Sequence, residues 1–360
     1  MTRTNSLAAI LICLVFAREP AYGGRYVFTK IADQTTVPGA LAFGQDPDDG
    51  PTINDNGDVV YFVDLGSSSE IVFNSKGVES VLAQDLPFAS ISPVNSGGTV
   101  AVTNWTSLVT VGAFQSSIPA QYDRLLNGVI NDQNDVAFRG RFDGTGPDTI
   151  FLASGGTISP LSPNLGLPAA INNAGQVALL EVFGSGTVTD GSTTTTIVNA
   201  PSDPNIGNVT GPITMNEAGE VAFRGGLTGG GFGIVVGDGG LLTVFADSLG
   251  DFDVIGKLNI NDIGEIAFRP TIAGGTAIYI GRDPIADRVI GAGDPLLGTT
   301  VVRVEMRDGP LNNAGQIVFH ARTTTNGEGI YVATPVPEPG GALIAISGVI
   351  LLTTWRRQRD

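Results

Sequence analysis

The stretch Ile260-Asn261-Asp262-Ile263-Gly264 decides how this chain folds, because versions of it recur along most of the sequence. Each version starts with an apolar residue followed by asparagine, and six of the seven end in glycine. The asparagines are Asn54, Asn95, Asn131, Asn172, Asn216, Asn261 and Asn312, with successive spacings of 41, 36, 41, 44, 45 and 51 residues. Self-similarity at such a period indicates a fold built from repeated structural units.

The composition of this motif predicts a tight turn. An asparagine side chain can accept a hydrogen bond from a backbone N–H two residues further on, which closes the turn locally. The last residue of the motif must reach a positive φ angle, which glycine does without a steric penalty. Asn134 replaces glycine there in the third repeat. Asparagine is the next most tolerant residue of that conformation, so the exception supports the turn.

A short apolar strand follows each turn, as in Ile266-Ala267-Phe268-Arg269. Large residues share one face of these strands, and alanine usually lies between them on the other. This pattern predicts a sheet packed on both faces, with small side chains accepting large ones from a neighbouring sheet. Three further strands are expected in each repeat, and in the fifth repeat they are placed at residues 233–236, 241–246 and 253–258.

Four short antiparallel strands in each repeat predict an all-β, seven-bladed β-propeller over residues 24–334. The last repeat reaches only its second strand, at residues 329–333, before the C-terminal tail. The missing half is expected near the N-terminus, at residues 26–33 and 39–44. Pairing of these N-terminal strands with the last repeat would close the ring and remove its exposed edges.

The two ends of the chain predict export. Arg3 precedes an apolar run from Leu7 to Ala17, and a stretch ending at Gly23 follows, which together predict a signal peptide over residues 1–23. Cys13, the only cysteine, lies inside that segment, so the mature protein would have no disulfide and no cysteine nucleophile.

The C-terminal residues 335–360 contain a Pro-Glu-Pro motif, an apolar stretch and an arginine cluster in that order. The motif is Val336, Pro337, Glu338 and Pro339, and the cluster is Arg356, Arg357 and Arg359. Together they resemble the PEP-CTERM sorting signal of Gram-negative-type bacteria, which implies recognition and processing by an exosortase. The repeats in turn resemble an uncharacterised family of propeller-like surface domains that often carry this tail, which implies architecture alone.

The physics of the tail agrees with that resemblance. The apolar stretch before Arg356 is expected to form a short transmembrane helix, and the arginines after it would stay in the cytoplasm by the positive-inside rule. The propeller would therefore be carried across the inner membrane by the secretion machinery and anchored by its tail. Processing would then leave it at the cell surface or in the extracellular matrix.

Charge and composition argue against some classes of partner and some classes of catalytic mechanism. The net charge of −16 would repel phosphate backbones, so nucleic acid is not expected as a partner. We find no catalytic constellation in the sequence: His320 is the only histidine, and a Gly-x-Ser-x-Gly elbow is missing. No cofactor is expected, apart from the calcium ion considered next.

Two sets of residues are candidate binding sites. Asp46, Asp48, Asp55 and Asp58 concentrate the oxygen ligands that Ca²⁺ requires, although such residues also form turns without an ion, and their register differs from that of an EF-hand. Arg139, Arg224, Arg269 and His320 occupy equivalent positions in four repeats. They would either form a cationic ring for an anionic sugar or pair with acidic residues between blades. Trp105 and Tyr122 are candidate exposed aromatic residues for stacking on sugars.

These observations favour a non-catalytic surface or matrix protein whose propeller binds exopolysaccharide or another secreted protein. The sugar partner follows from the resemblance, because PEP-CTERM tails are associated with bacteria that produce exopolysaccharide. The alternative is an extracytoplasmic propeller enzyme, for example a calcium-dependent hydrolase or lyase, which predicts a cluster of Asp or Glu in one funnel of the ring. A passive filler of the cell surface is a third possibility.

Overall fold

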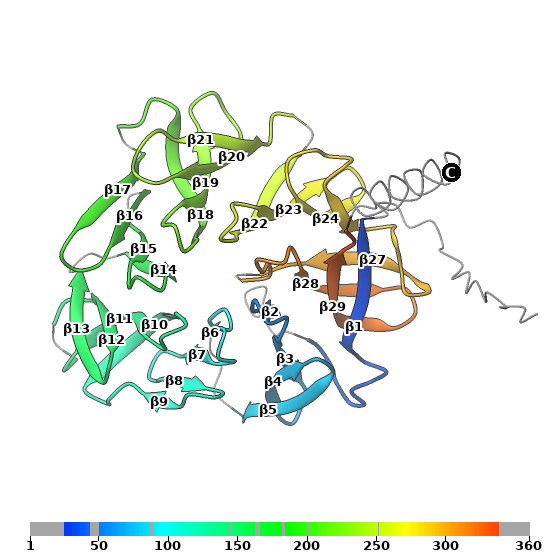
Figure 1. The fold of residues 1–360 in the computed structure, drawn as a ribbon, viewed down its shortest axis with the longest axis horizontal. Coiled ribbons are helices and arrows are strands. Elements are labelled where there is room, and N and C mark those ends of the chain that lie inside the picture. The colour runs from blue at the N-terminus through cyan, green and yellow to red at the C-terminus, as the bar shows by residue number, and fades with distance from the viewer. Residues whose placement is uncertain are drawn as a thin grey trace, which may run out of the picture.

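The computed structural model describes residues 25–43, 50–85, 90–144, 146–162, 166–181, 184–200, 202–250, 252–307 and 309–337. These residues form 29 β-strands in seven sheets. The sheets are arranged as blades around a common axis, which confirms the predicted all-β, seven-bladed propeller (Figure 1). Within this part of the chain no helix has the length and apolarity needed to cross a membrane.

Each of the first six blades has four antiparallel strands, numbered from the axis outwards. Blades one to three contain β2 (Thr52–Ile53), β3 (Val59–Asp64), β4 (Ser69–Ser75), β5 (Val78–Gln84), β6 (Ser90–Ile91), β7 (Val100–Thr103), β8 (Leu108–Val111), β9 (Ser116–Ser117), β10 (Tyr122–Ile130), β11 (Val136–Phe142), β12 (Thr149–Ser154) and β13 (Thr157–Ser162). Blades four to six contain β14 (Leu167–Ile171), β15 (Val177–Leu180), β16 (Ser185–Thr189), β17 (Thr194–Asn199), β18 (Ile206–Met215), β19 (Val221–Leu227), β20 (Phe232–Gly237), β21 (Thr243–Asp247), β22 (Val254–Ile260), β23 (Ile266–Ile272), β24 (Gly275–Ile280) and β25 (Arg288–Gly291).

The seventh blade joins the two ends of the described chain. It contains β26 (Pro295–Leu296), β27 (Thr299–Glu305), β28 (Ile317–Thr323), β29 (Gly327–Pro335) and, on its outer edge, β1 (Tyr26–Asp33). Strand β1 pairs antiparallel with β29 from Tyr26 opposite Pro335 to Asp33 opposite Gly329. The expected closure of the ring by N-terminal sequence is therefore present.

The closure uses one N-terminal strand, whereas the sequence suggested two. Residues 39–43 do not join the last blade: the Leu41 N–H donates to the Asp64 carbonyl of the first blade at 2.8 Å, and Ala42 bridges the same residue. The reason is that β27, with the two-residue strand β26 beside it, already occupies the other side of β28, so only a strand outside β29 was missing.

The division of the repeat into blades also differs from the expectation by one strand. Each asparagine turn joins the innermost and second strands of one blade, instead of opening the blade. Residues 253–258, expected as the last strand of the fifth repeat, fall in β22, which pairs with β23 as the innermost strand of the sixth blade. Strand spacing in the sequence cannot distinguish the two divisions, because both leave the same strands in the same order.

The predicted packing on both faces of each sheet is confirmed. Phe138, Phe223, Phe268 and Phe319 are fully buried at equivalent positions of four second strands. The alanine that precedes such a phenylalanine belongs to the apolar cluster of the next blade: Ala222 packs in one cluster with Phe268, and Ala267 in one with Phe319. The position requires a small residue because side chains of the neighbouring blade fill the space above it.

The pairing of β1 with β29 can be tested by a cross-link. Val27 and Thr334 lie directly opposite each other, at a separation that suits a disulfide. In a background with Cys13 changed to Ser, we expect Val27→Cys/Thr334→Cys to form an intramolecular disulfide. That disulfide should raise the free energy of unfolding by about 2 to 4 kcal/mol relative to the reduced protein.

Mass spectrometry under non-reducing conditions and thermal unfolding measure the two effects. The matched control is Val27→Cys/Val302→Cys, because β29 and β28 lie between β1 and the strand that carries Val302. Cross-linking of the control, or of neither pair, would contradict the observed closure.

Candidate functional site

The seven asparagine turns meet around the axis and are joined to one another by their side chains. Within its own turn, the Asn261 Oδ1 atom accepts a hydrogen bond from the Glu265 N–H at 2.8 Å. The Asn261 Nδ2 atom donates to the carbonyl of Asn312, the equivalent residue of the next blade, at 3.1 Å. Asn312 in turn donates to the Asn54 carbonyl at 3.0 Å and thereby links the last repeat to the first.

The same bridge is present at six of the seven interfaces between blades. The other four run from Asn54 to Asn95, Asn95 to Asn131, Asn131 to Asn172 and Asn216 to Asn261, with lengths of 2.9 to 3.4 Å. All seven asparagines are buried, so water is a poor substitute for these bonds. We call this arrangement the asparagine ring.

A second ring, not anticipated from the sequence, lies next to it. In six of the seven repeats, the residue after the asparagine uses a side-chain oxygen to accept a backbone N–H from the turn of the preceding blade. Asp262, for example, accepts from the Glu217 N–H at 2.8 Å, and Asp55 accepts from the Asn313 N–H at 2.8 Å. The four remaining acceptors are Asp132, Asn173, Glu217 and Asn313. We call this set the acceptor ring.

The acceptor ring explains a sequence pattern that turn chemistry alone does not. In six of the seven repeats the residue after the asparagine is Asp, Asn or Glu, each with a side-chain oxygen of sufficient reach. Ser96 is the exception, and there the Asn56 amide spans the interface by donating to the Ser96 carbonyl at 2.8 Å. The pattern was visible in the sequence, but its purpose depends on a neighbouring blade.

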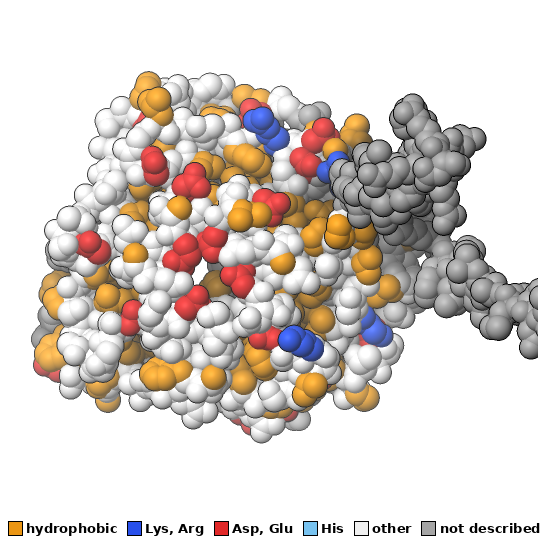
Figure 2. Space-filling view, in the orientation of Figure 1, with side chains coloured by type: hydrophobic (Ala, Val, Ile, Leu, Met, Phe, Trp, Pro, Cys, Tyr) orange, Lys and Arg blue, Asp and Glu red, His pale blue; other side chains and the backbone are white. Residues whose placement is uncertain are grey.

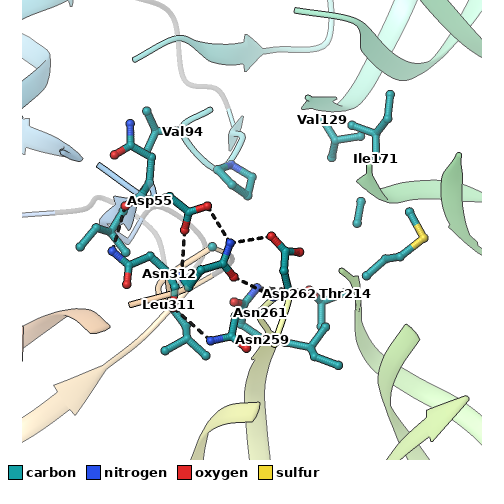
Figure 3. A pocket seen from close by; sticks show the side chains of 18 of the residues that line it. Asp55, Val94, Val129, Ile171, Thr214, Asn259, Asn261, Asp262, Leu311 and Asn312 are labelled. Carbon is teal, nitrogen blue, oxygen red and sulfur yellow. Dashed lines mark hydrogen bonds between the residues drawn. The ribbon is translucent and has the colours of Figure 1, made fainter. Parts of the chain in front are cut away.

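Four carboxylates of this ring make one end of the axial channel acidic. They are Asp55, Asp132, Glu217 and Asp262, and all are partly exposed to solvent. Figure 2 shows acidic side chains around the opening at the centre of this face, and Figure 3 shows Asp55, Asn261, Asp262 and Asn312 converging on a cavity of about 200 Å³. Acidic residues thus gather at one end of the ring, as the enzyme alternative requires.

The carboxylates differ in their protonation behaviour. Burial opposes ionisation of Asp132, but hydrogen bonds from the Ser96 N–H and the Asn173 amide outweigh it and lower the pKa of Asp132. Burial raises the pKa of Glu217; the hydrogen bond from the Asn173 N–H opposes this shift, and the charges of the other three carboxylates add to it. The pKa values of Glu217 and Asp132 are thus shifted in opposite directions within the same ring.

The opposite end of the channel has a different chemistry. A cavity of about 480 Å³ opens there, and we call it the Trp105 mouth. Its polar lining includes Thr103, Asn104, Trp105, Asn127 and Lys257, and its apolar lining includes Pro93, Pro168 and Pro212. The two cavities meet at Pro93, Val129, Ala169 and Ile213, which line both.

Two of the three arginines at the equivalent cationic positions form ion pairs with acidic residues. The Arg139 Nη2 atom lies 2.6 Å from the Asp148 Oδ2 atom. The Arg269 Nε atom lies 3.1 Å from the Glu305 Oε2 atom, which joins the sixth blade to the seventh. The Arg269 contact is of the kind that the inter-blade alternative describes, whereas Arg139 and Asp148 belong to the same blade.

The other two positions are also engaged. The Arg224 Nη1 atom donates to the Ile255 carbonyl of the next blade at 3.1 Å, and its guanidinium lies over the ring of Phe232. The His320 Nε2 atom lies 3.5 Å from the Glu328 Oε2 atom. Among the described residues that line the two axial cavities, none is one of these four cations.

The candidate calcium ligands divide into two groups. Asp46 and Asp48 lie outside the described residues. Asp55 belongs to the acceptor ring, and Asp58 is buried with its Oδ2 atom 3.3 Å from the Asn54 amide. In the described ranges, no group of three or more His, Cys, Asp or Glu side chains is placed to hold a metal ion.

Tyr122 is not exposed, contrary to the expectation from the sequence. It is buried and packs edge-on against Phe138 and Phe151 with ring centroids 6.0 and 5.0 Å away, so it cannot stack on a sugar. Trp105 is exposed as expected, at 64% of its surface. A tyrosine that starts an inner strand is drawn into the core by the aromatic residues of its own blade.

The sorting motif is described only at its start. The Val336 N–H donates to the Arg25 carbonyl at 2.6 Å, beside the pairing of β1 with β29. The signal peptide, Glu338, Pro339, the apolar stretch of the tail, and Arg356, Arg357 and Arg359 lie outside the described residues.

Comparisons with known proteins find similarity of fold alone. No protein-family model and no curated sequence matches this chain. The structure of YCF48 from Cyanidioschyzon merolae is 12% identical and covers 82% of this chain and 98% of its own, with a TM-score of 0.44. Virginiamycin B lyase from Staphylococcus aureus is 12% identical, with coverage of 86% and 100% and a TM-score of 0.46. The gluconolactonase XC5397 from Xanthomonas campestris is 9% identical, with coverage of 90% and 100% and a TM-score of 0.38.

The asparagine ring predicts a specific loss of stability. Changing Asn312 to Ala removes the bond to the Asn54 carbonyl and those within its own turn, to the Gln316 N–H and side chain. We expect Asn312→Ala to lower the free energy of unfolding by about 2 to 3 kcal/mol, because a buried carbonyl also loses its donor. Asn205→Ala is the matched control at an exposed position. Equal destabilisation by both variants in urea titrations would count against the ring.

The acidic ring predicts opposite pH dependences for two variants. The raised pKa of Glu217 means that its contribution to stability is full below the ordinary glutamate range and is lost as the pH rises through the folded-state pKa. Glu217→Gln should therefore stabilise the protein at neutral pH, and the gain should vanish near pH ~4. The lowered pKa of Asp132 gives a contribution that is present at neutral pH and lost in acid. Asp132→Asn should therefore destabilise at neutral pH only.

Both effects are expected to be about 0.5 kcal/mol, since solvent screens these exposed groups. Urea titrations between pH ~2.5 and ~7 measure them, a range that extends below the ordinary carboxylate pKa values, where the Asp132 contribution is lost, and reaches neutrality. Shifts of the same sign for the two variants would contradict the assigned directions.

Proposed function

We propose that this chain is an exported, exosortase-processed protein of the cell surface or extracellular matrix, and that its propeller is a non-catalytic scaffold that binds polysaccharide. The proposal on sorting rests on the N-terminal apolar segment and the Pro-Glu-Pro tail. The proposal on binding rests mainly on the Trp105 mouth, where an exposed indole borders a cavity lined by amide and hydroxyl groups. Such a mixture of an aromatic face and hydrogen-bonding groups suits sugars.

The chemistry of the acidic end supports a scaffold role. Each ring carboxylate accepts a backbone N–H from the neighbouring turn, so its negative charge already holds two blades together. A hydrogen bond to the ionised form favours that form, which makes each carboxylate a weaker proton acceptor for a substrate. The acceptor ring is thus better suited to support of the fold than to proton transfer.

Sorting can be tested in a bacterial host that carries an exosortase. We expect the wild-type chain to be found on the cell surface without residues after the Pro-Glu-Pro motif, as measured by mass spectrometry of the released protein. A Pro337→Ala/Glu338→Ala variant should remain membrane-bound with its tail intact. Identical processing of both proteins would overturn the exosortase assignment.

Binding can be tested with the full chain in mild detergent on a glycan array. Retention of at least one acidic or neutral polysaccharide supports the proposal, and failure to bind any glycan overturns its binding part. The gathering of carboxylates at one end favours a second candidate, the calcium-dependent hydrolase or lyase. Turnover of lactones or phosphoesters that requires Ca²⁺ and is lost in Glu217→Gln would favour that enzyme.

A further inference from the structure

One position in the third strand of every blade packs against the next blade. It lies directly opposite the second residue of the second strand; in the seventh blade these two strands are β29 and β28. Apolar residues occupy it in six blades: Phe73, Leu152, Val188, Val236, Ile280 and Val332. In blade two the residue is Thr110, opposite Ala101. Ala101 packs in one cluster with Phe138 of blade three, so the Thr110 side chain lies at the interface between these two blades.

The Thr110 hydroxyl has no partner in this interface. Thr110 is 4% exposed, and its Oγ1 atom makes no hydrogen bond among the described residues. A buried hydroxyl without a partner destabilises the folded state, whereas valine has nearly the same shape and no polar group. Valine occupies this position in three other blades, so such an interface accepts it. The threonine of blade two is explained if a ligand supplies the missing partner.

A cavity of about 480 Å³ adjoins Thr110 between blades two and three, which lie side by side (Figure 1). We call it the Thr110 cavity. Its lining includes the buried Leu108 and Val136 and the exposed Ser116 and Ser117, so it reaches from the interface to the surface. The outermost strand of blade two, β9, has two residues, whereas those of blades one and three to six have four to seven, so β9 covers less of the interface. Small-molecule sites usually have volumes of ~300–1,000 Å³, a range that includes this cavity.

The lining of the Thr110 cavity is uncharged. Its apolar part includes Leu108, Phe114, Ile118, Val136 and Ile158, and its polar side chains are those of serine, threonine, asparagine and glutamine. None of the described residues that line it is Asp, Glu, Lys, Arg or His, although the chain has a net charge of −16. An ion entering the cavity would lose hydration without gaining a counter-charge, so the lining favours a neutral molecule.

We propose that the Thr110 cavity binds a small neutral molecule with an apolar body and one hydroxyl or carbonyl oxygen, which forms a hydrogen bond with the Thr110 hydroxyl. Rotation about the Cα–Cβ bond of Thr110 moves the hydroxyl between staggered positions and can present it to the ligand. Phe114, Ile118 and Ile158 would contact the apolar body. The inference goes beyond the function proposed above, because none of the residues that line this cavity lines the Trp105 mouth.

Binding can be measured with the full chain in mild detergent and two probes that share one body, neutral 2-naphthol and anionic naphthalene-2-sulfonate. By calorimetry, the wild type should bind 2-naphthol, and it should bind the sulfonate about tenfold more weakly because the lining offers no cation. Thr110→Leu places in blade two the residue type of Leu152 and should weaken 2-naphthol binding by about tenfold, because the larger side chain fills part of the cavity. Thr195→Leu is the matched control, because it makes the same change at an exposed position of β17 that does not line the cavity. It also corrects for uptake of the probes by detergent.

The hydroxyl has a test of its own. Thr110→Val should raise the midpoint of thermal unfolding in the absence of ligand, because it removes an unpaired buried hydroxyl. The same variant should weaken 2-naphthol binding by about two- to tenfold, the loss expected for one hydrogen bond. Thr110→Ser keeps the hydroxyl and should bind 2-naphthol more tightly than Thr110→Val. A purely structural role of Thr110 would not produce opposite changes in stability and affinity.

The outcomes distinguish the parts of this proposal. Failure of the wild type to bind 2-naphthol overturns it. If Trp105→Ala loses 2-naphthol binding and Thr110→Leu retains it, the probe binds at the Trp105 mouth and the site assigned here is wrong. Equal binding of the two probes contradicts the preference for a neutral ligand. If Thr110→Val binds as tightly as wild type, the hydroxyl is not the partner of the ligand. The glycan and sorting experiments remain separate tests of the proposed function.

Discussion

A single side chain in each repeat must satisfy a tight turn and a neighbouring blade together. The asparagine oxygen closes its own turn, and the asparagine nitrogen donates to the turn of the next blade. Aspartate lacks the donor, and a serine hydroxyl is too short to do both. Because both bonds are buried, their loss leaves polar groups without partners, which fixes the position of every blade relative to the axis.

Because of that constraint, the residue types at one end of the propeller are more restricted than those at the other end. At the end that carries the turns, the backbone N–H of the residue after the asparagine donates to the side chain of the equivalent residue in the next blade. Carboxylates or amides supply the accepting oxygen in six repeats. This end of the propeller is therefore acidic and is joined by hydrogen bonds between blades. At the opposite end the described bonds between blades differ from one interface to the next, such as the Leu125 N–H to the Trp105 carbonyl and the Arg224 guanidinium to the Ile255 carbonyl. Residues at that end can therefore differ between blades and form a site such as the Trp105 mouth.

Closure of the ring follows the same logic. The bond from Asn312 to the Asn54 carbonyl joins repeats 258 residues apart, and β1 beside β29 completes the outer edge of the last sheet. Cations at equivalent positions of the second strands add bonds between or within blades, as Arg269 does with Glu305. The ring is thus closed at the axis by side-chain hydrogen bonds and at the outer edge of the last blade by backbone pairing.

The sequence by itself determined the repeat, the turn and the packing on both faces of the sheets, because each depends on neighbours a few residues away: Asn261 with Gly264, or Ala267 between Ile266 and Phe268. It could not place a strand in one blade or the next, since the order of strands is the same in both cases. Nor could it show that Asp262 holds the turn of Glu217, that Tyr122 is buried, or that Trp105, Asn127 and Lys257 border one cavity. Those relations join residues from different strands or blades, and only the tertiary structure brings them together.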